Sequence, residues 1–495
     1  MTPMSARDRL PQRPAGHAPA DLDRHEYDVI VLGAGSTGTN VAGRARAGDL
    51  SVLVVETELV GGDCSYWACM PSKALLRPVE VLTDAQGIEG SRQAATGSLD
   101  APAVFARRDT FTHGWDDGSQ VQWLDGVQAA LVRGQARLVG ERQVEVAGSE
   151  GDPVTVTARH AVAVCVGSEA TIPPIDGIED VGPWTSRDAT SADDAPARLT
   201  VIGGGVVGVE MATAWSALGS TVSLLGSADR LLPRMEPQAG EHVRAALEAR
   251  GVTVRLGVSA ESASRIDGVV TVGLDDGTEV HSDELLVATG RRPRTADIGL
   301  DAVGLEPGDA LETDDTMRVR AVQAGWLYAA GDCTGRAMLT HMGKYQARMC
   351  GDAIAARAAG RDVDDRPWGR TSATADHTAV PKVVFTDPPA GSVGRTLAEA
   401  REAGLRVRLV EQDMGGVAGA SLYADDYQGW AGLVVDEDRR VVVGATFVGP
   451  GSSELVHAAT VAVVGEVPVD RLWHAVPSYP TISEVWLLLL QRYGL

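Results

Sequence analysis

Two cysteines, Cys64 and Cys69, have a spacing that could support redox chemistry. A continuous helix would separate them by about 7.5 Å along its axis, which exceeds the Cα separation of about 7 Å that a disulfide tolerates. A bond between them therefore requires distorted backbone, which the neighbouring Gly61, Gly62 and Pro71 can supply. Because so short a loop adds little stability, the pair predicts a redox disulfide; two unrelated buried thiols are the alternative.

Lysine is rare in this chain, because arginine carries nearly all of its positive charge. The lysines are Lys73, Lys344 and Lys382. Lys73 follows Cys69 by four residues, and a cation beside a thiol favours the reactive thiolate. Where arginine occupies most of the positively charged surface positions, a retained lysine indicates a position that needs a compact ammonium group. Lys344 and Lys382 have no such context and are interpreted as chance retentions.

A nucleotide-binding pattern must position these groups. Residues 27–32 predict a buried strand, followed by three glycines, an Ala-rich helix and a second strand at 51–55 that ends at Glu56. The glycines are Gly33, Gly35 and Gly38. They allow a tight turn and a close approach of a pyrophosphate to the helix N-terminus, and Glu56 is placed to accept hydrogen bonds from a ribose.

The same pattern recurs at residues 199–225, with glycines at Gly203, Gly205 and Gly208. Equal spacing aligns Glu56 with Gly226, so the second site lacks the acid that would repel a 2′-phosphate. Ser227 and Arg230 follow closely, which favours NADPH over NADH; a solvated surface role for Arg230 is the alternative. Two nucleotide sites beside a redox pair predict a flavoprotein that contains FAD.

Composition excludes several function classes. The net charge of −23 argues against nucleic acid and anionic membranes as partners. No apolar run reaches transmembrane length. Residues 1–26 lack an apolar signal region and predict a disordered tail. With only five cysteines in the chain, a cytoplasmic location is expected.

From residue 26 to 495 the motifs resemble, in order, those of the pyridine nucleotide–disulfide oxidoreductases, the group of glutathione reductase, dihydrolipoamide dehydrogenase and mercuric reductase. The matching segments are 62–73, 166–177, 288–293, 328–332, 384–388 and 443–450. The resemblance implies an α/β fold with two Rossmann-like dinucleotide-binding domains and a C-terminal α+β dimerisation domain. The implied divisions are a tail at 1–26, an FAD domain at 27–190 that carries the disulfide, an NAD(P) domain at 191–310, a second FAD segment at 311–375 and an interface domain at 376–495.

The resemblance also implies residue roles. Cys64 resembles the thiol that attacks substrate, and Cys69 resembles the thiol that faces the flavin. Lys73 and Glu210 resemble an ion pair beside the flavin and nicotinamide. Further cofactor-binding positions implied are Gly167, Gly290, Gly331, Asp332 and His341. No metal site is expected, and Cys165, Cys333 and Cys350 match no redox position and predict small apolar packing residues.

The chain departs from the family near its C-terminus, where Tyr479 stands in place of the acid–base histidine while Glu484 is kept. An unperturbed tyrosine moves protons poorly at neutral pH. Mercuric reductases also place a tyrosine here, but this chain lacks their terminal cysteine pair. His341 and His474 are alternative proton donors, each more simply structural.

Two aromatics, Tyr66 and Trp67, lie inside the cysteine loop. They stack on a flat substrate in one interpretation and pack inward in the other.

We predict an enzyme that passes electrons from NAD(P)H through FAD and the Cys64–Cys69 disulfide to a small disulfide acceptor, as a homodimer in which Tyr479 reaches the partner subunit. The alternatives are a quinone, metal-ion or other non-disulfide acceptor, and a non-catalytic flavoprotein subunit, against which the intact cysteine pair argues.

Overall fold

In a computed structural model, which describes residues 16–495, the first glycine-containing segment folds as the sequence predicts. It forms β1 (Glu26–Leu32), α1 (Ser36–Arg46) and β2 (Val52–Glu56). The two strands pair in parallel, with Leu32 opposite Val55. Their nearly continuous Val, Ile and Leu runs suit parallel strands that are buried on both faces.

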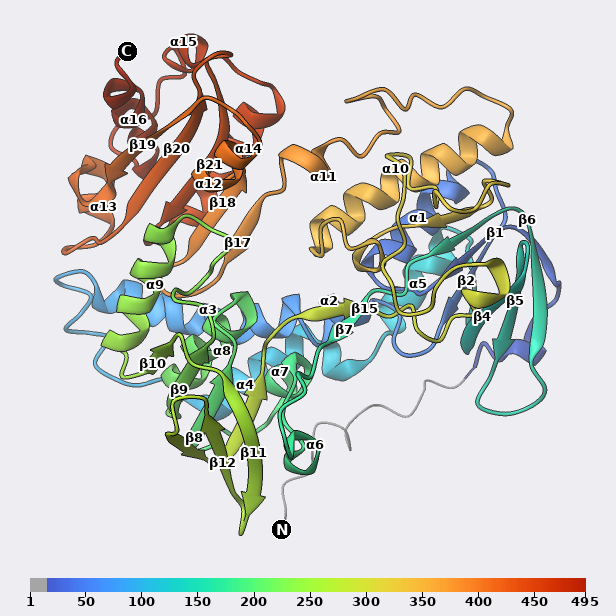
Figure 1. The fold of residues 1–495 in the computed structure, drawn as a ribbon, viewed down its shortest axis with the longest axis horizontal. Helices are drawn as coiled ribbons and strands as arrows, with labels where there is room; N and C mark the ends of the chain where they lie inside the picture. The colour runs from blue at the N-terminus through green and yellow to red at the C-terminus, as the bar shows by residue number, and fades with distance from the viewer. Residues whose placement is uncertain (1–15) are drawn as a thin grey trace. The chain divides into compact units, whose positions relative to one another are not determined.

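These strands belong to a seven-stranded sheet of order β3-β2-β1-β6-β5-β4, with β16 added beside β6. The added strands are β3 (Ala130–Arg133), β4 (Gln135–Gly140), β5 (Gln143–Ala147), β6 (Val154–Val164) and β16 (Leu327–Ala329). β6 pairs in parallel with β1 and antiparallel with β5. Helix α1 lies beside the long helix α10 (Thr340–Ala358), as Figure 1 shows.

Short elements complete this first unit. They are η2 (Pro19–Asp21), α2 (Gly62–Tyr66), η3 (His113–Trp115), α5 (Gly118–Gly126), β7 (Ser168–Ala170), β15 (Arg291–Pro293), η4 (Asp301–Val303) and η5 (Asp332–Thr334). β7 and β15 pair antiparallel, so the family-like segments 166–177 and 288–293 run side by side here. Of the predicted tail, residues 1–15 lie outside the described residues, while the His17 carbonyl oxygen accepts a hydrogen bond from Arg133 N at 2.8 Å.

The second glycine-containing segment repeats the arrangement in a four-stranded parallel sheet of order β10-β9-β8-β14. Its strands and helices are β8 (Arg198–Ile202), α8 (Val206–Ala217), β9 (Thr221–Gly226), α9 (Pro237–Ala249), β10 (Thr253–Leu256) and β14 (Glu284–Val287). A three-stranded antiparallel sheet is inserted, made of β11 (Ala260–Ile266), β12 (Val269–Leu274) and β13 (Glu279–Ser282). The predicted pair of dinucleotide-binding folds is therefore confirmed.

The C-terminal part is an antiparallel sheet of order β17-β18-β21-β20-β19 with helices around it. Its elements are β17 (Lys382–Val384), β18 (Ala390–Gly394), α12 (Leu397–Glu402), β19 (Val407–Asp413), η6 (Met414–Gly416), α13 (Ala418–Tyr423), β20 (Trp430–Asp436), β21 (Val441–Val448), η7 (Ser452–Glu454), α14 (Leu455–Val464), α15 (Val469–Leu472), η8 (Ile482–Glu484) and α16 (Val485–Tyr493). Within residues 16–495, no helix combines the length and apolar character needed to cross a bilayer.

The compact units differ from the predicted domain limits. One unit holds residues up to 71, 109–170 and 291–376, and the other holds 72–108, 171–290 and 377–495. In this division the chain passes from one unit to the other at 170 and again at 290, whereas the predicted domain limits are 190 and 310. Most of α3 (Cys69–Gln86) and α4 (Ala101–Phe111) joins the second unit, because their apolar side chains enter its core. Phe105 of α4, for example, packs against Trp215 of α8, with ring centroids 6.0 Å apart. Two short helices, α6 (Ile178–Val181) and α7 (Ser186–Ser191), also belong there, and α11 (Ala375–Thr378) lies where the chain leaves the first unit.

Candidate active site

The N-terminus of α1 forms a cradle that suits a phosphate. Gly33 has φ +97°, and a Cβ there would lie 2.5 Å from the Cys165 carbonyl oxygen, while a Cβ at Gly38 would collide with the Gly33 carbonyl oxygen. Gly35 caps the helix without a side chain. The backbone N–H groups of the first turn therefore stay accessible to an anion, which the helix dipole also favours.

The second cradle is built in the same way at α8, where Gly205 is the N-cap and a Cβ at Gly208 would collide with Gly203. Gly203 N donates to Leu225 O at 2.8 Å, just as Gly33 N donates to Val55 O at 2.8 Å. The next residues along the strands are Gly226 and Glu56. The structure therefore confirms the alignment of these two positions that spacing predicted.

The two nucleotide sites differ in charge after their second strands. Glu56 is buried; its carboxylate accepts hydrogen bonds from Ala34 N at 2.6 Å and Glu58 N at 2.8 Å, and burial raises its pKa. At the second site Ser227 is exposed, and the half-buried Arg230 donates to Pro233 O at 2.8 Å. Contacts of Glu56, Ser227 and Arg230 with a nucleotide stay predictions.

The cysteine pair lies where the backbone changes direction. Cys64 is in the short helix α2, which ends at Tyr66, and Trp67 has φ −136°, outside the helical range. Cys69 then begins α3. The predicted irregularity between the two cysteines is thus present. The two cysteines are half-buried thiols, not a disulfide, in this structure, and Cys69 Sγ lies 3.1 Å from the Thr340 hydroxyl in the first turn of α10.

Neighbouring groups make Cys64 a weaker acid than an ordinary thiol. A hydrogen bond with Cys69 has the largest effect in raising the pKa of Cys64, followed by burial and by the negative charge of a Cys69 thiolate. Thr340 and Lys344 act in the opposite direction. Lys344 is exposed one turn after Thr340 in α10, so the interpretation of this lysine as a chance retention missed an electrostatic effect on the dithiol.

Replacing Cys69 with serine should therefore lower the pH midpoint for alkylation of Cys64 in the reduced protein, by about one pH unit or more. Removal of the group that raises the pKa of Cys64 leaves a thiol that ionises at lower pH. Lys344→Met should move the midpoint upward, because it removes a favourable charge. Iodoacetamide labelling with peptide mapping gives the midpoint, and Ser65→Ala is the control on the same helix. An unchanged midpoint in Cys69→Ser would contradict the coupling.

The predicted ion pair between Lys73 and Glu210 is present. Lys73 Nζ lies 2.7 Å from Glu210 Oε2, and the Glu210 side chain is 4% exposed against 34% for Lys73. The other carboxylate oxygen accepts a hydrogen bond from Phe385 N at 2.9 Å, and the Lys73 ammonium lies 4.8 Å from the Phe385 ring centre. Glu210 thus fixes the position of the Lys73 ammonium, while the Lys73 side chain stays partly exposed.

An ionic chain that the sequence did not predict links the cysteine loop to Asp332. Arg291 pairs with Asp63 at 2.6 Å, and its Nε donates to the Ser168 hydroxyl at 2.8 Å. Ser168 in turn donates to Asp332 Oδ2 at 2.6 Å. Burial raises the pKa of Asp332, and the hydrogen bond from Ser168 and the charge of Arg291 oppose that rise. Arg291 lies in the family-like segment 288–293, but nothing in that local sequence indicates an ion pair with Asp63.

The aromatic residues of the cysteine loop point inward. Tyr66 and Trp67 are 1% and 4% exposed, and they cluster with Leu59 and Trp115. The Tyr66 hydroxyl donates to Val60 O at 3.2 Å, and Trp115 Nε1 donates to Tyr66 O at 3.2 Å. Inward packing is therefore the correct interpretation, and the proposed stacking of these two rings on a substrate is wrong.

The other predicted residues lie on several elements of the two units. Gly167 has φ +72° just before β7, Gly290 has φ +150° before β15, and Gly331 has φ +84° before η5. His341 is exposed in the first turn of α10. Tyr479 is 78% exposed and His474 is also exposed, while Glu484 Oε2 is buried and accepts no hydrogen bond from the described residues. Cys165, Cys333 and Cys350 are buried in the apolar cores of the first unit, as packing residues should be.

Comparison with known proteins assigns the family. Residues 27–347 match the family described as pyridine nucleotide-disulphide oxidoreductase, and residues 380–489 match its dimerisation domain. The chain belongs to this family. It is therefore a flavin-dependent oxidoreductase that acts on a sulfur group with a pyridine nucleotide, and the predicted fold class and enzyme class are confirmed.

The relatives include enzymes with different acceptors. A dihydrolipoyl dehydrogenase of Haloferax volcanii is 32% identical over 92% of this chain and 94% of its own length. A mercuric reductase of Acidithiobacillus ferrooxidans is 31% identical over 95% of this chain and 83% of its own length. Because the two classes match almost equally well, identity alone does not select the acceptor.

Solved structures share the fold. LpdA from Mycobacterium tuberculosis superposes with a TM-score of 0.80 at 24% identity and covers 95% of this chain and all of its own. The flavoprotein disulfide reductase RclA from Escherichia coli, in a Cu(II) complex, gives a TM-score of 0.80 at 23% identity and covers 94% of this chain and 99% of its own.

The residues present fit FAD in the first unit. The cradle at Gly33 and Gly38 has no room for side chains, the first turn of α1 offers backbone donors, and the Asp332 carboxylate lies on a turn that a chain of hydrogen bonds holds. These are the features that a dinucleotide requires: close backbone approach for its pyrophosphate and acceptors for its hydroxyl groups.

Proposed function

We propose that this chain is an NADPH-dependent reductase of a low-molecular-weight disulfide, with Cys64 as the attacking thiol and Cys69 as the resolving thiol. Bound FAD would supply the route by which electrons from the nicotinamide reach the Cys64–Cys69 disulfide. The observation that carries the proposal is the cysteine pair itself, which sits across a helix break with Cys69 against Thr340 and Cys64 tuned by its neighbours.

Cys64 and Cys69 are sufficient for the two thiol–disulfide exchange steps. The Cys64 thiolate attacks one sulfur of the acceptor disulfide, forms a mixed disulfide and releases the first thiol. Cys69 then attacks Cys64 Sγ, which releases the second thiol and restores the internal disulfide. Overall, one NADPH and one proton reduce one disulfide to two thiols.

Proton delivery is the step in which this chain differs from disulfide reductases with a histidine. Because its neighbours raise the pKa of Cys64, attack requires a base. We infer that Tyr479 of the partner subunit in a homodimer occupies the base position, held near Glu484. The 78% exposure of Tyr479 on a segment of the dimerisation domain favours this arrangement, and turnover should then rise with pH through the alkaline range.

A panel of small disulfides tests the proposal directly. With NADPH under anaerobic conditions, at least one member should give about two thiols for each NADPH oxidised. Members should include linear, cyclic, acidic and neutral disulfides. If no disulfide is reduced while a quinone or a metal ion is, the acceptor assignment is wrong.

The second candidate is a metal-ion or quinone reductase. The similarity to mercuric reductases, together with Tyr479 in place of histidine, favours it. Against it, the cysteines other than Cys64 and Cys69 are Cys165, Cys333 and Cys350, and all three are buried in apolar cores.

For the nucleotide, we propose NADPH. Arg230→Ala should raise the KM for NADPH about tenfold and leave the KM for NADH unchanged, because a guanidinium contact with a 2′-phosphate is worth about 1.4 kcal/mol. Arg244→Ala is the matched control, since Arg244 pairs with Glu248 on the exposed face of α9. Equal changes in KM for both nucleotides in Arg230→Ala would contradict the preference for NADPH that was inferred from Gly226.

A further inference from the structure

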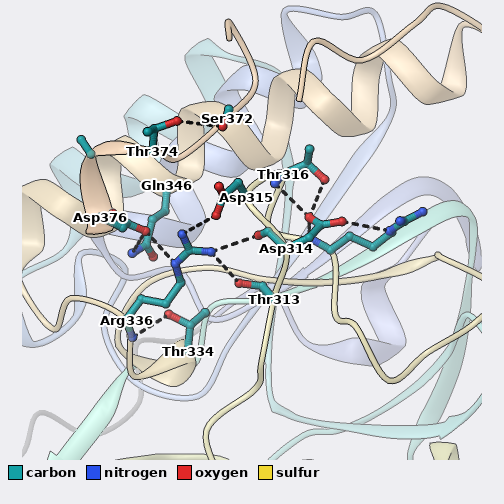
Figure 2. Close-up of polar contacts among 12 residues, drawn as sticks. Thr313, Asp314, Asp315, Thr316, Thr334, Arg336, Gln346, Ser372, Thr374 and Asp376 are labelled. Carbon is teal, nitrogen blue, oxygen red and sulfur yellow. Dashed lines mark hydrogen bonds and ion pairs between the residues drawn. The ribbon is translucent and has the colours of Figure 1, made fainter. Parts of the chain in front are cut away.

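Arg336 is the centre of a buried ionic cluster in the first unit, drawn in Figure 2. Its side chain is 13% exposed, and it pairs with Asp315 at 2.8 Å and with Asp376 at 3.0 Å. A further N–H of the guanidinium donates to the Asp314 carbonyl oxygen at 3.1 Å. The Asp376 side chain is only 1% exposed. A carboxylate buried to this degree depends on its charged partner, so the pair holds both segments in place.

Gln346 connects this cluster to the turn that carries Asp332. The side chain is fully buried in α10; Nε2 donates to Asp376 Oδ2 at 2.9 Å, and Oε1 accepts from Gly331 N at 2.7 Å. A carboxylate can only accept, so the amide nitrogen must face Asp376 and the amide oxygen must face Gly331. The orientation of Gln346 is therefore set jointly by the Asp376 carboxylate and the Gly331 N–H.

The turn is held from its other end as well. Gly331 has φ +84°, and its carbonyl oxygen accepts from the Thr334 hydroxyl at 2.8 Å, a hydroxyl that also lies 3.4 Å from Arg336 N. Both the amide and the carbonyl of Gly331 are thereby fixed. Gln346 therefore fixes the peptide between Ala330 and Gly331, and Thr334 fixes the next peptide, which precedes Asp332.

Asp376 is the last residue of the first unit, and it lies in α11 at the point where the chain leaves for the C-terminal part. We propose that Asp376, Gln346 and Arg336 are positioning residues that couple the FAD-binding turn at Gly331–Asp332 to this exit segment. Coupling of this kind is reciprocal: FAD should order the exit segment, and a weakened exit contact should weaken FAD. The proposal rests on FAD binding by the family and goes beyond it.

The test uses the full chain stripped of flavin and titrated with FAD, with binding followed by quenching of flavin fluorescence. Asp376→Asn should raise the Kd for FAD about tenfold, because the amide loses the charge that orients Gln346 and pairs with Arg336. The control is Asp364→Asn, a carboxylate of the same unit whose partner Arg366 is 82% exposed. Hydrogen exchange of residues 372–380 should slow on addition of FAD in the wild-type protein and respond less in Asp376→Asn.

A merely structural role predicts a different pattern, in which Asp376→Asn destabilises the flavin-free protein while its Kd for FAD matches that of Asp364→Asn. That pattern overturns the coupling. If Asp376→Asn does not fold, Gln346→Met decides, since it cuts the link to Gly331 and leaves the ion pair; a wild-type Kd in Gln346→Met also overturns the proposal. A wild-type protein that binds no FAD would overturn the cofactor assignment as well, which separates the two failures.

Discussion

Replacing Cys64 with serine should abolish NADPH-driven disulfide reduction, with a loss of at least about a thousandfold in kcat/KM. A hydroxyl at this position cannot attack a disulfide sulfur. Cys69 has no second thiol with which to re-form an internal disulfide in this variant, and Cys165, Cys333 and Cys350 are buried in apolar cores. Thiol release, measured with a chromogenic thiol reagent under anaerobic conditions, is the readout.

The control for Cys64→Ser is Ser65→Ala in the same short helix. The Ser65 hydroxyl donates to the Gly61 carbonyl oxygen at 3.3 Å. This variant should keep wild-type turnover. The same Cys64→Ser protein separates the two acceptor classes: reduction of a quinone at the flavin should survive, while reduction of disulfides should not. Disulfide turnover near the wild-type level in Cys64→Ser would contradict the assigned role of this cysteine.

Replacing Lys73 with methionine should slow reduction of the enzyme by NADPH about 10- to 100-fold. The ammonium is the cation that the ion pair with Glu210 holds in a fixed position, with the Glu210 carboxylate also tied to the backbone at Phe385. The family resemblance implies that Lys73 lies beside the flavin, where loss of its fixed charge would remove stabilisation of the developing negative charge that water does not replace. Stopped-flow absorbance under anaerobic conditions measures the rate.

The same change should also cost about 2–3 kcal/mol in the free energy of unfolding, because it leaves a buried carboxylate with a single backbone donor; the partial exposure of Lys73 keeps the cost below that of a fully buried pair. Lys73→Arg should recover most of this stability and little of the rate, since a planar guanidinium does not replace a compact ammonium. Lys382→Met is the matched control on β17. A wild-type reduction rate in Lys73→Met would exclude the electrostatic role.

Local patterns were sufficient to predict the parts of the fold that depend on short-range geometry. The glycines at 33 and 38 must be glycines because backbone atoms fill the space of a side chain, so strand, turn and helix could be placed from the sequence. The alignment of Glu56 with Gly226 followed from equal spacing. The pairing of Lys73 with Glu210 came from the family resemblance alone, because their own sequence contexts do not connect them.

Contacts between distant segments could not be predicted in this way. The link from Asp63 through Arg291 to Asp332, and the cluster around Arg336, join residues whose local sequences look like ordinary charged loops. The assignment of α3 and α4 to the second unit depends on which core accepts their apolar side chains, which periodicity does not specify. The orientation of Tyr66 and Trp67 was likewise open, since a short irregular loop has no repeating face.

We propose above all that the Cys64–Cys69 pair is a working redox disulfide that exchanges electrons with the flavin. Anaerobic titration of the FAD-loaded enzyme with NADPH tests it most directly. We expect uptake of about four electrons per subunit, two more than FAD alone accepts, with a long-wavelength charge-transfer band at the first stage that disappears in Cys69→Ser. Uptake of only two electrons without such a band in the wild-type enzyme would contradict it.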